Sequence, residues 1–92
     1  MNVFWSSAAW DDYVDFHARD LALAQKINEL IADIRRTPFA GLGKPEPLRG
    51  PLSGWWSRRI NQEHRLVYRL VGVRGRDQRL EIVQCRFHYE RR

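Results

Sequence analysis

The spacing of apolar residues changes once along this chain, and that change constrains the fold more than any other feature. Between residues 10 and 34 apolar side chains recur every three or four positions, as on one face of a helix, whereas after the loop at 37–47 they recur at every second position. A period of two is typical of strands with one buried face. Helices that come first and strands that follow can bury both apolar faces when the helices cover one side of an antiparallel sheet. The sequence therefore predicts an α+β two-layer sandwich.

Local signals place the ends of the predicted elements. Ser6 or Ser7 is suited to cap the first helix and Asp20 to cap the second. Thr37 precedes Pro38 and ends the second helix, because the residue before a proline avoids helical geometry. The short connection at Asp20 predicts an antiparallel helix pair. In chain order the expected elements are a strand at 2–5, a helix that ends near residue 19, a helix at about 21–36, and strands at 56–60, 64–72 and 79–89.

The strand pattern also predicts which polar residues lie on the uncovered face of the sheet. In the last strand Arg86 and His88 share one face, because alternate side chains point the same way. The opposite face holds Val83, Cys85 and Phe87. We expect Arg65 of the middle strand to join Arg86 and His88 on the uncovered side. Arg58 or Arg59 of the neighbouring strand adds a further positive charge.

Charge is distributed unevenly along the chain. Residues 1–34 hold two basic and six acidic groups, and residues 35–92 hold fourteen basic and five acidic groups, for a net charge of +5. Fourteen of the sixteen cations are arginine, whose planar fork of donors suits phosphate and stacks on bases. A basic half of this kind indicates nucleic-acid binding. A solvated basic surface without a partner is the alternative that charge alone leaves open.

The polar residues near the predicted sheet suit one reaction in particular. RNA can be cut without a metal when a base takes the proton of a ribose 2′-OH, that oxygen attacks the adjacent phosphate and an acid protonates the departing 5′-oxygen. Glu46, between two prolines, and His88 can supply the base and the acid, and Arg65 can stabilise charge on the phosphate. The sequence shows no paired carboxylates and no Cys/His ligand spacing, so we expect neither a metal nor a cofactor.

Other sequence features indicate how many domains the chain has and in which compartment it acts. Its 92 residues predict a single domain, residues 1–92, with one modest core. No apolar run reaches the roughly 18 residues of a membrane span, and the N-terminus lacks the pattern of a signal peptide. A single cysteine, Cys85, suits a reducing compartment, so a cytoplasmic protein is expected.

Longer motifs make the chain resemble a known family. The run INELIADIRRTPFAGLGKPEPLRGPLSGWWSRRINQEHRLVY, the opening FWSSAAWDDYVDF and the closing CRFHY resemble the YoeB-type toxins of the RelE/ParE superfamily. The resemblance implies a RelE/YoeB-like fold and a metal-independent endoribonuclease that cleaves mRNA in the ribosomal A site. It also implies a YefM-type antitoxin that neutralises the toxin, operator DNA bound only through the toxin–antitoxin complex, and a tendency to form homodimers.

The same resemblance implies a role for each site residue. Glu46 falls at the position of the general base, Arg65 at that of the residue supporting the phosphate, and His88 at that of the general acid. Tyr89 matches the tyrosine that helps position substrate. Further contacts with substrate or phosphate are expected from Arg59, Lys44, Arg49 and Arg86.

Three features depart from the family pattern without removing any of these residues. The chain continues past the His-Tyr pair with residues 90–92, its turn at 72–79 is longer and more basic than usual, and Arg49 stands where lysine is frequent. Two other functions stay open at the level of sequence. One is a non-catalytic RNA binder or a ParE-like toxin with another target, and the other is an inactive toxin kept as an antitoxin partner and operon co-repressor.

Overall fold

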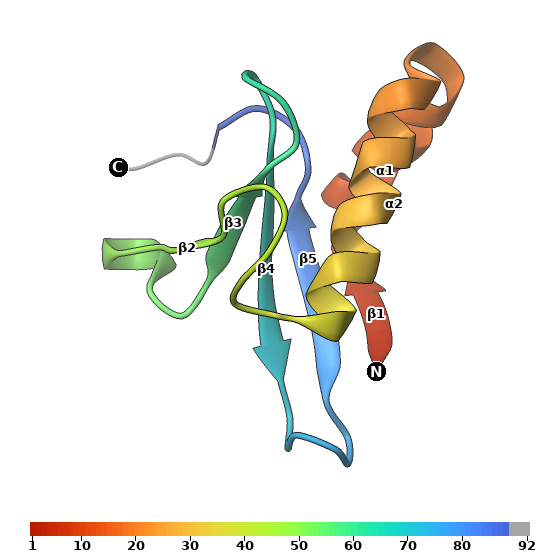
Figure 1. The fold of residues 1–92 in the computed structure, drawn as a ribbon. Helices are drawn as coiled ribbons and strands as arrows, with labels where there is room; N and C mark the ends of the chain where they lie inside the picture. The colour runs from red at the N-terminus through yellow and green to blue at the C-terminus, as the bar shows by residue number, and fades with distance from the viewer. Residues whose placement is uncertain (89–92) are drawn as a thin grey trace.

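The computed structural model describes residues 1–88 and confirms the predicted α+β architecture. Two antiparallel helices form one layer and a five-stranded sheet forms the other (Figure 1). The elements are β1 (Asn2–Trp5), α1 (Ser7–Arg19), α2 (Leu21–Arg36), β2 (Glu46–Pro47), the 3-10 turn η1 (Gly50–Leu52), β3 (Trp56–Arg59), β4 (Arg65–Val71) and β5 (Arg79–Gln84).

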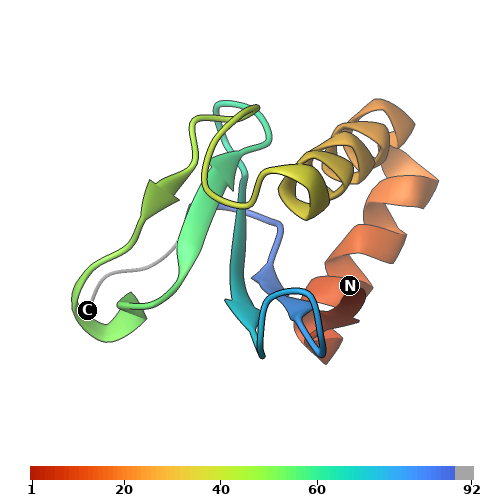
Figure 2. The ribbon, with the colours of Figure 1, turned by 60° about the horizontal axis from the view of Figure 1, so that its bottom comes forward.

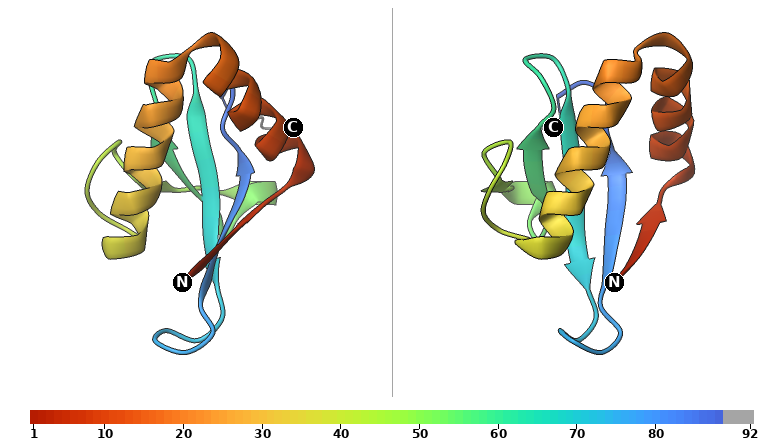
Figure 3. Two further views of the ribbon diagram at one scale, coloured as in Figure 1. Left: turned by 90° about the vertical axis from the view of Figure 1, so that its right-hand side faces the viewer. Right: turned by 45° about the vertical axis from the view of Figure 1, so that its right-hand side comes forward.

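The sheet is mainly antiparallel, with strand order β1-β5-β4-β3-β2. Among the strands of residues 1–88, only β1 runs parallel to its neighbour, β5. Strands β3, β4 and β5 form the predicted meander. Both helices cover one face of this sheet, and β1 lies at its edge beside β5 (Figure 3). On the other edge, the Pro-Glu-Pro segment that was predicted to be loop forms the two-residue strand β2. Proline is tolerated there because an edge strand need not donate every backbone hydrogen bond.

Both helices begin at the predicted caps. The side chain of Ser6 accepts a hydrogen bond from the backbone N–H of Ala9 at 3.1 Å, and that of Asp20 accepts one from Leu23 at 3.2 Å. Helix α2 contributes most of the helical core residues, which pack against the apolar side of β4 and β5. This core includes Ile27, Leu30, Ile34, Leu66, Tyr68, Leu80 and Ile82. The helix layer therefore leaves the other face of the sheet available for a site.

Arg58 is fully buried beneath the helices, so the sequence-based option that it adds charge to the uncovered face is wrong. Its Nη1 donates to the Asp33 carboxylate at 2.6 Å and its Nε donates to the Tyr68 hydroxyl at 3.2 Å. The same guanidinium donates to the carbonyls of Thr37, Ala40 and Leu42, at 2.7, 2.8 and 3.0 Å. These bonds fix the loop that connects α2 to β2, and with it the start of the segment that carries Glu46.

The last strand is shorter than predicted. It ends at Gln84, and a bulge interrupts its pairing with β4, since Val67 pairs with Gln84 and Tyr68 with Ile82. A bulge adds one residue to a strand and reverses the faces of the residues that follow. Cys85 is therefore buried while Val83 is 37% exposed. Phe87 lies beyond the strand, has a positive φ of 63° and is 59% exposed. The expectation that these three side chains share one face is wrong.

The buried Cys85 thiol leads to a first prediction. Burial raises the pKa of Cys85 to about 12, and the nearby Asp12 carboxylate adds to the shift. Because the thiolate is the reactive form of cysteine, we expect iodoacetamide at about pH 8 to leave the folded protein unlabelled and to label it fully in denaturant. Mass spectrometry measures the extent of labelling. Rapid labelling of the folded protein would show that the segment after β5 opens readily.

Candidate active site

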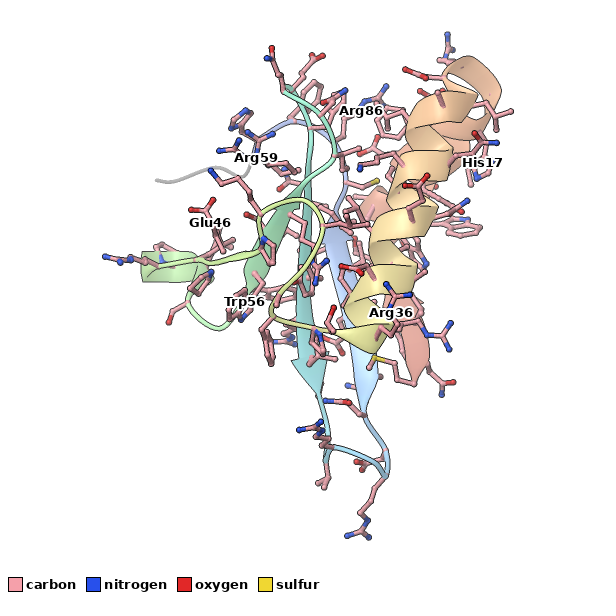
Figure 4. All side chains as sticks on the ribbon, viewed as in Figure 1. His17, Arg36, Glu46, Trp56, Arg59 and Arg86 are labelled. Carbon is pink, nitrogen blue, oxygen red and sulfur yellow. The ribbon has the colours of Figure 1, made fainter. Side chains whose placement is uncertain are left out.

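Three of the predicted site residues lie on the face of the sheet away from the helices. In the strand pairing, Glu46 stands opposite Ser57, and Arg59 stands opposite Arg65. Paired side chains point to the same face, and so do side chains two positions apart on one strand. Glu46, Arg59 and Arg65 therefore share a face, and Figure 4 shows Glu46 and Arg59 on the side opposite the helices. Strand alternation in β3 and β4 thus places Arg59 and Arg65 on the uncovered face of the sheet, as the sequence predicted.

The backbone before Glu46 is held close to the end of β3. The Arg59 N–H donates to the Gly43 carbonyl at 2.7 Å, which continues the contact between this segment and β3 beyond the paired residues. Gly43 has a positive φ of 80°, and a Cβ there would lie 2.9 Å from the Arg59 carbonyl oxygen, so only glycine fits. The exposed Lys44 lies next along the segment, two residues before Glu46. Figure 2 shows the arm formed by β2 and η1 projecting from the sheet on the side away from the helices.

An open hollow of about 540 Å³ lies where β3 ends and β4 begins. It is lined by Arg59, Asn61, Gln62 and Arg65. The Nη1 atom of Arg65 donates to the carbonyls of Asn61 at 2.8 Å and His64 at 3.1 Å. Within residues 1–88 the other two guanidinium nitrogens of Arg65 have no hydrogen-bond partner. The turn between β3 and β4 thus binds Nη1 of Arg65. The donors on the other two guanidinium nitrogens are available for an anion.

The segment after β5 brings His88 to this hollow. The Arg65 N–H donates to the Phe87 carbonyl at 3.0 Å, and the Phe87 N–H donates to Nδ1 of His64 at 2.8 Å. His88 Nε2 lies 3.2 Å from the Gln62 carbonyl oxygen. Because a carbonyl only accepts, Nε2 of His88 carries the hydrogen in this contact. The same Gln62 oxygen lies 3.4 Å from Nη1 of Arg65, so one carbonyl links the two side chains.

Residues of the β3–β4 turn were not predicted to belong to the site. Asn61 and Gln62 hold Arg65 and His88 through backbone carbonyls, and no pattern of residue types in the sequence reports such a role. His64 is 7% exposed and packs its ring between Phe16 and Phe87, with centroid distances of 5.3 and 5.7 Å. Since Nδ1 of His64 accepts a backbone N–H, its hydrogen is on Nε2. His64 therefore supports the backbone of the residue before His88.

Arg86 does not lie beside His88, so that expectation is wrong. Its Nη1 and Nη2 donate to the carboxylates of Asp12 and Asp15 in α1, at 3.0 and 3.1 Å, and its guanidinium lies 4.8 Å above the Phe16 ring. Figure 4 places Arg86 between the end of the sheet and the helices. The reason is that β5 ends at Gln84, so strand alternation no longer determines the direction of the side chains that follow.

The pKa values of this ion-pair cluster are shifted in the directions that pairing requires. The hydrogen bond from Arg19 and then the one from Arg86 lower the pKa of Asp15. The hydrogen bond to Asp12 is the main cause that raises the pKa of Arg86. Arg86 therefore links the segment after β5 to α1.

One of the two remaining predicted residues, Arg49, does not line the hollow. Arg49 is exposed and directly precedes η1, on the projecting arm. Tyr89 lies outside the described residues. Within residues 1–88, no group of three His, Cys, Asp or Glu side chains is placed to hold a metal ion. None of the helices in this part of the chain has the length and apolar character needed to span a bilayer.

Comparison with known proteins identifies a family for this arrangement. Residues 5–89 match the family described as YoeB-like toxin of bacterial type II toxin-antitoxin system. The toxin YoeB of Escherichia coli K12 is 54% identical over 89 residues, which cover 97% of this chain and 100% of that protein. A solved YoeB/ParE toxin from Agrobacterium tumefaciens is 56% identical, with a TM-score of 0.94 over 97% of this chain and 100% of that one.

A Staphylococcus aureus relative has been solved in two assemblies. One is a heterotetrameric YoeB-YefM toxin-antitoxin complex, in which the matched chain is 42% identical, has a TM-score of 0.85 and is covered to 98%, against 97% of this chain. The other is a YoeB dimer with the same TM-score and coverage and 43% identity. The agreement in sequence and in fold extends over both layers and over the segment that carries the candidate site. The chain is therefore a member of the YoeB-like toxins of bacterial type II toxin–antitoxin systems.

Proposed function

We propose that this toxin is an endoribonuclease that cuts mRNA in the ribosomal A site without a metal ion. The observation that carries the proposal is the shared Gln62 carbonyl, which places the Nε2–H of His88 beside the guanidinium of Arg65. Arg65 and Gln62 line a hollow together with Arg59, on the face that carries Glu46. A proton donor and two cations, with an exposed carboxylate on the same face of the sheet, suit attack on a phosphodiester.

In the proposed reaction Glu46 removes the proton from a ribose 2′-OH. The 2′-oxygen attacks the adjacent phosphorus and forms a new P–O bond. The bond from phosphorus to the 5′-oxygen breaks, and His88 donates its Nε2 proton to that oxygen. The products are a 2′,3′-cyclic phosphate on one fragment and a 5′-hydroxyl on the other, with the proton balance closed between the two side chains and solvent.

The cations and the loop geometry supply the remaining contributions. Arg65 and Arg59 stabilise the negative charge that builds on the phosphate oxygens during attack. Tyr89 positions the substrate, and Lys44 and Arg49 contact the RNA backbone further from the reacting atoms. Prolines on both sides of Glu46 restrict its backbone, which reduces the entropy lost when the carboxylate aligns with the 2′-OH.

The partners follow from the family. Because a Staphylococcus aureus relative forms a YoeB-YefM heterotetramer and also a YoeB dimer, we expect a YefM-type antitoxin to neutralise this chain in the cytoplasm and the free toxin to form a homodimer. Operator DNA is then bound only through the toxin–antitoxin complex. Light scattering of the toxin alone and with a YefM-type antitoxin measures both assemblies.

Primer extension on mRNA in a bacterial in vitro translation reaction tests the proposed chemistry. We expect a cut at the A-site codon, a 5′-hydroxyl on the downstream fragment, and loss of the cut when the attacking nucleotide carries 2′-deoxyribose. Cleavage of the deoxy substrate, or a 5′-phosphate on the fragment, would contradict attack by the 2′-OH. Absence of any cut together with salt-dependent RNA affinity would favour a non-catalytic RNA-binding toxin instead.

A further inference from the structure

A second hollow lies at the opposite end of the sheet from the candidate active site. It has a volume of about 220 Å³ and lies between the end of α2 and the turn from β4 to β5, with Arg35, Arg36, Phe39 and Arg74 among its lining residues. Figure 4 shows Arg36 at the end of α2, away from Glu46 and Arg59. In Figure 1 the β4–β5 turn extends beyond the sheet at this end. The hollow is therefore distinct from the site proposed to cut RNA.

The charge of this second hollow is positive and only partly compensated. Arg36 donates to the Asp33 carboxylate at 2.7 Å, and the same carboxylate also binds the buried Arg58. One negative charge is therefore paired with two guanidiniums. Arg35 and Arg74 are exposed, and neither forms an ion pair within residues 1–88.

The nearest carboxylate of the β4–β5 turn is engaged in the turn itself. Asp77 accepts the Val73 N–H at 2.7 Å, and this bond closes the turn that presents Arg74. The exposed guanidiniums of Arg35 and Arg74 therefore offer donors for an anion that comes from another molecule.

An exposed aromatic ring completes the wall of the second hollow. Phe39 is 54% exposed, and its ring packs on Trp56 with a centroid distance of 4.7 Å and an interplanar angle of 37°. Contact with the larger Trp56 ring holds Phe39 in place. An exposed aromatic ring beside arginines is the combination that binds single-stranded nucleic acid, because bases stack on the ring and phosphates pair with the guanidiniums.

We propose that this hollow binds a segment of RNA that is separate from the segment to be cut, with phosphates on Arg35 and Arg74 and a base on Phe39. An acidic peptide would satisfy the arginines but would not require the exposed ring, so RNA is the better match to the hollow. The proposal rests on the proposed function only in that RNA is the partner. It assigns a purpose to the long basic turn at 72–79, which the cleavage reaction does not use.

Binding of an RNA that cannot be cut tests this site independently of catalysis. The probe is a fluorescent single strand of about 20 nucleotides with 2′-O-methyl groups throughout, and anisotropy is measured over a series of KCl concentrations. We expect Arg35→Ala/Arg74→Ala to weaken binding by about tenfold or more at low salt. We also expect the slope of log K against log salt to become shallower by about 1.4, since each phosphate contact in a single strand contributes about 0.7.

A matched variant controls for the loss of charge. Arg19→Ala/Lys26→Ala removes an equal number of positive charges, two, from the helices and outside the second hollow. We expect this variant to bind the probe within about twofold of the parent protein, with an unchanged salt slope. Equal loss of affinity in both double variants would overturn the proposal, because the effect would then follow from net charge alone.

The aromatic contact distinguishes RNA from an acidic peptide. Phe39→Leu keeps an apolar side chain on Trp56. We expect it to weaken RNA binding about 5- to 160-fold with an unchanged salt slope, given a stacking contribution of about 1–3 kcal/mol per base. If Phe39→Leu binds RNA as the parent does while poly-L-glutamate competes through Arg35 and Arg74, the site accepts an acidic peptide and the RNA proposal fails. If the parent protein cuts mRNA and Arg35→Ala/Arg74→Ala binds the probe unchanged, only this further inference fails.

Discussion

Replacement of His88 by alanine is expected to slow mRNA cleavage about 10²- to 10⁴-fold, which is the usual contribution of a general acid. The side chain is exposed and contacts the described protein through the single Nε2 hydrogen bond to Gln62, so the variant should fold as the parent does. Quantitative primer extension in the translation reaction measures the rate. Circular dichroism through thermal unfolding provides the check on folding.

A substrate with a better leaving group separates proton donation from positioning. When the 5′-oxygen at the cleaved bond is replaced by sulfur, the leaving group departs without protonation. We expect this substrate to restore the rate of His88→Ala but not that of Glu46→Gln, because the base is still required. His88→Gln keeps a donor to Gln62 but cannot transfer a proton, so it should be as slow as His88→Ala on normal RNA. Rescue of Glu46→Gln, or normal cleavage by His88→Gln, would show that the roles are assigned wrongly.

Replacement of Arg58 by methionine is expected to lower the free energy of unfolding by about 3–5 kcal/mol, the usual effect of removing one partner from a buried ion pair. Arg58 is fully buried and donates hydrogen bonds to one carboxylate, one hydroxyl and three loop carbonyls. Methionine fills part of the volume but leaves these acceptors without their donor. Urea denaturation monitored by tryptophan fluorescence measures the change. Arg59→Met is the matched control on the next, exposed position and should change stability by less than about 0.5 kcal/mol.

Acid provides a second test of the same cluster. The Leu42 N–H, and then Arg58, hold the pKa of Asp33 below its ordinary value of 3.8. A carboxyl group whose pKa is lowered on folding contributes stability that is complete above 3.8 and is lost as the pH falls through its folded-state pKa. We expect Arg58→Met to lose less stability than the parent as the pH falls from above 3.8 through the folded-state pKa of Asp33. If the free energy of unfolding falls equally with decreasing pH in the two proteins, Arg58 has little influence on the ionisation of Asp33.

Much of the fold could be predicted because its determinants are local. Ser6 and Asp20 cap helices through hydrogen bonds within one turn, and the alternation in β3 and β4 places Arg59 and Arg65 on the face away from the helices. The same alternation fails from Val83 onward, where a bulge and then the left-handed Phe87, with φ of 63°, redirect the chain. A bulge depends on how two strands fit against one another, so it leaves no clear pattern in the sequence of either strand.

The sequence by itself determined the order of the elements, the helix ends, the rigid segment around Glu46 and the membership of a toxin family, because these depend on residues close together in the chain or on long motifs. Only the tertiary structure decided which arginines serve structure and which face solvent. Arg58 and Arg59 are neighbours of the same type, yet one is buried on Asp33 and the other lines the hollow. Likewise His64 and Gln62 hold the residues around His88 through a ring nitrogen and a carbonyl from another part of the chain. Such contacts join residues more than 20 positions apart, and residue type alone does not specify a partner at that separation.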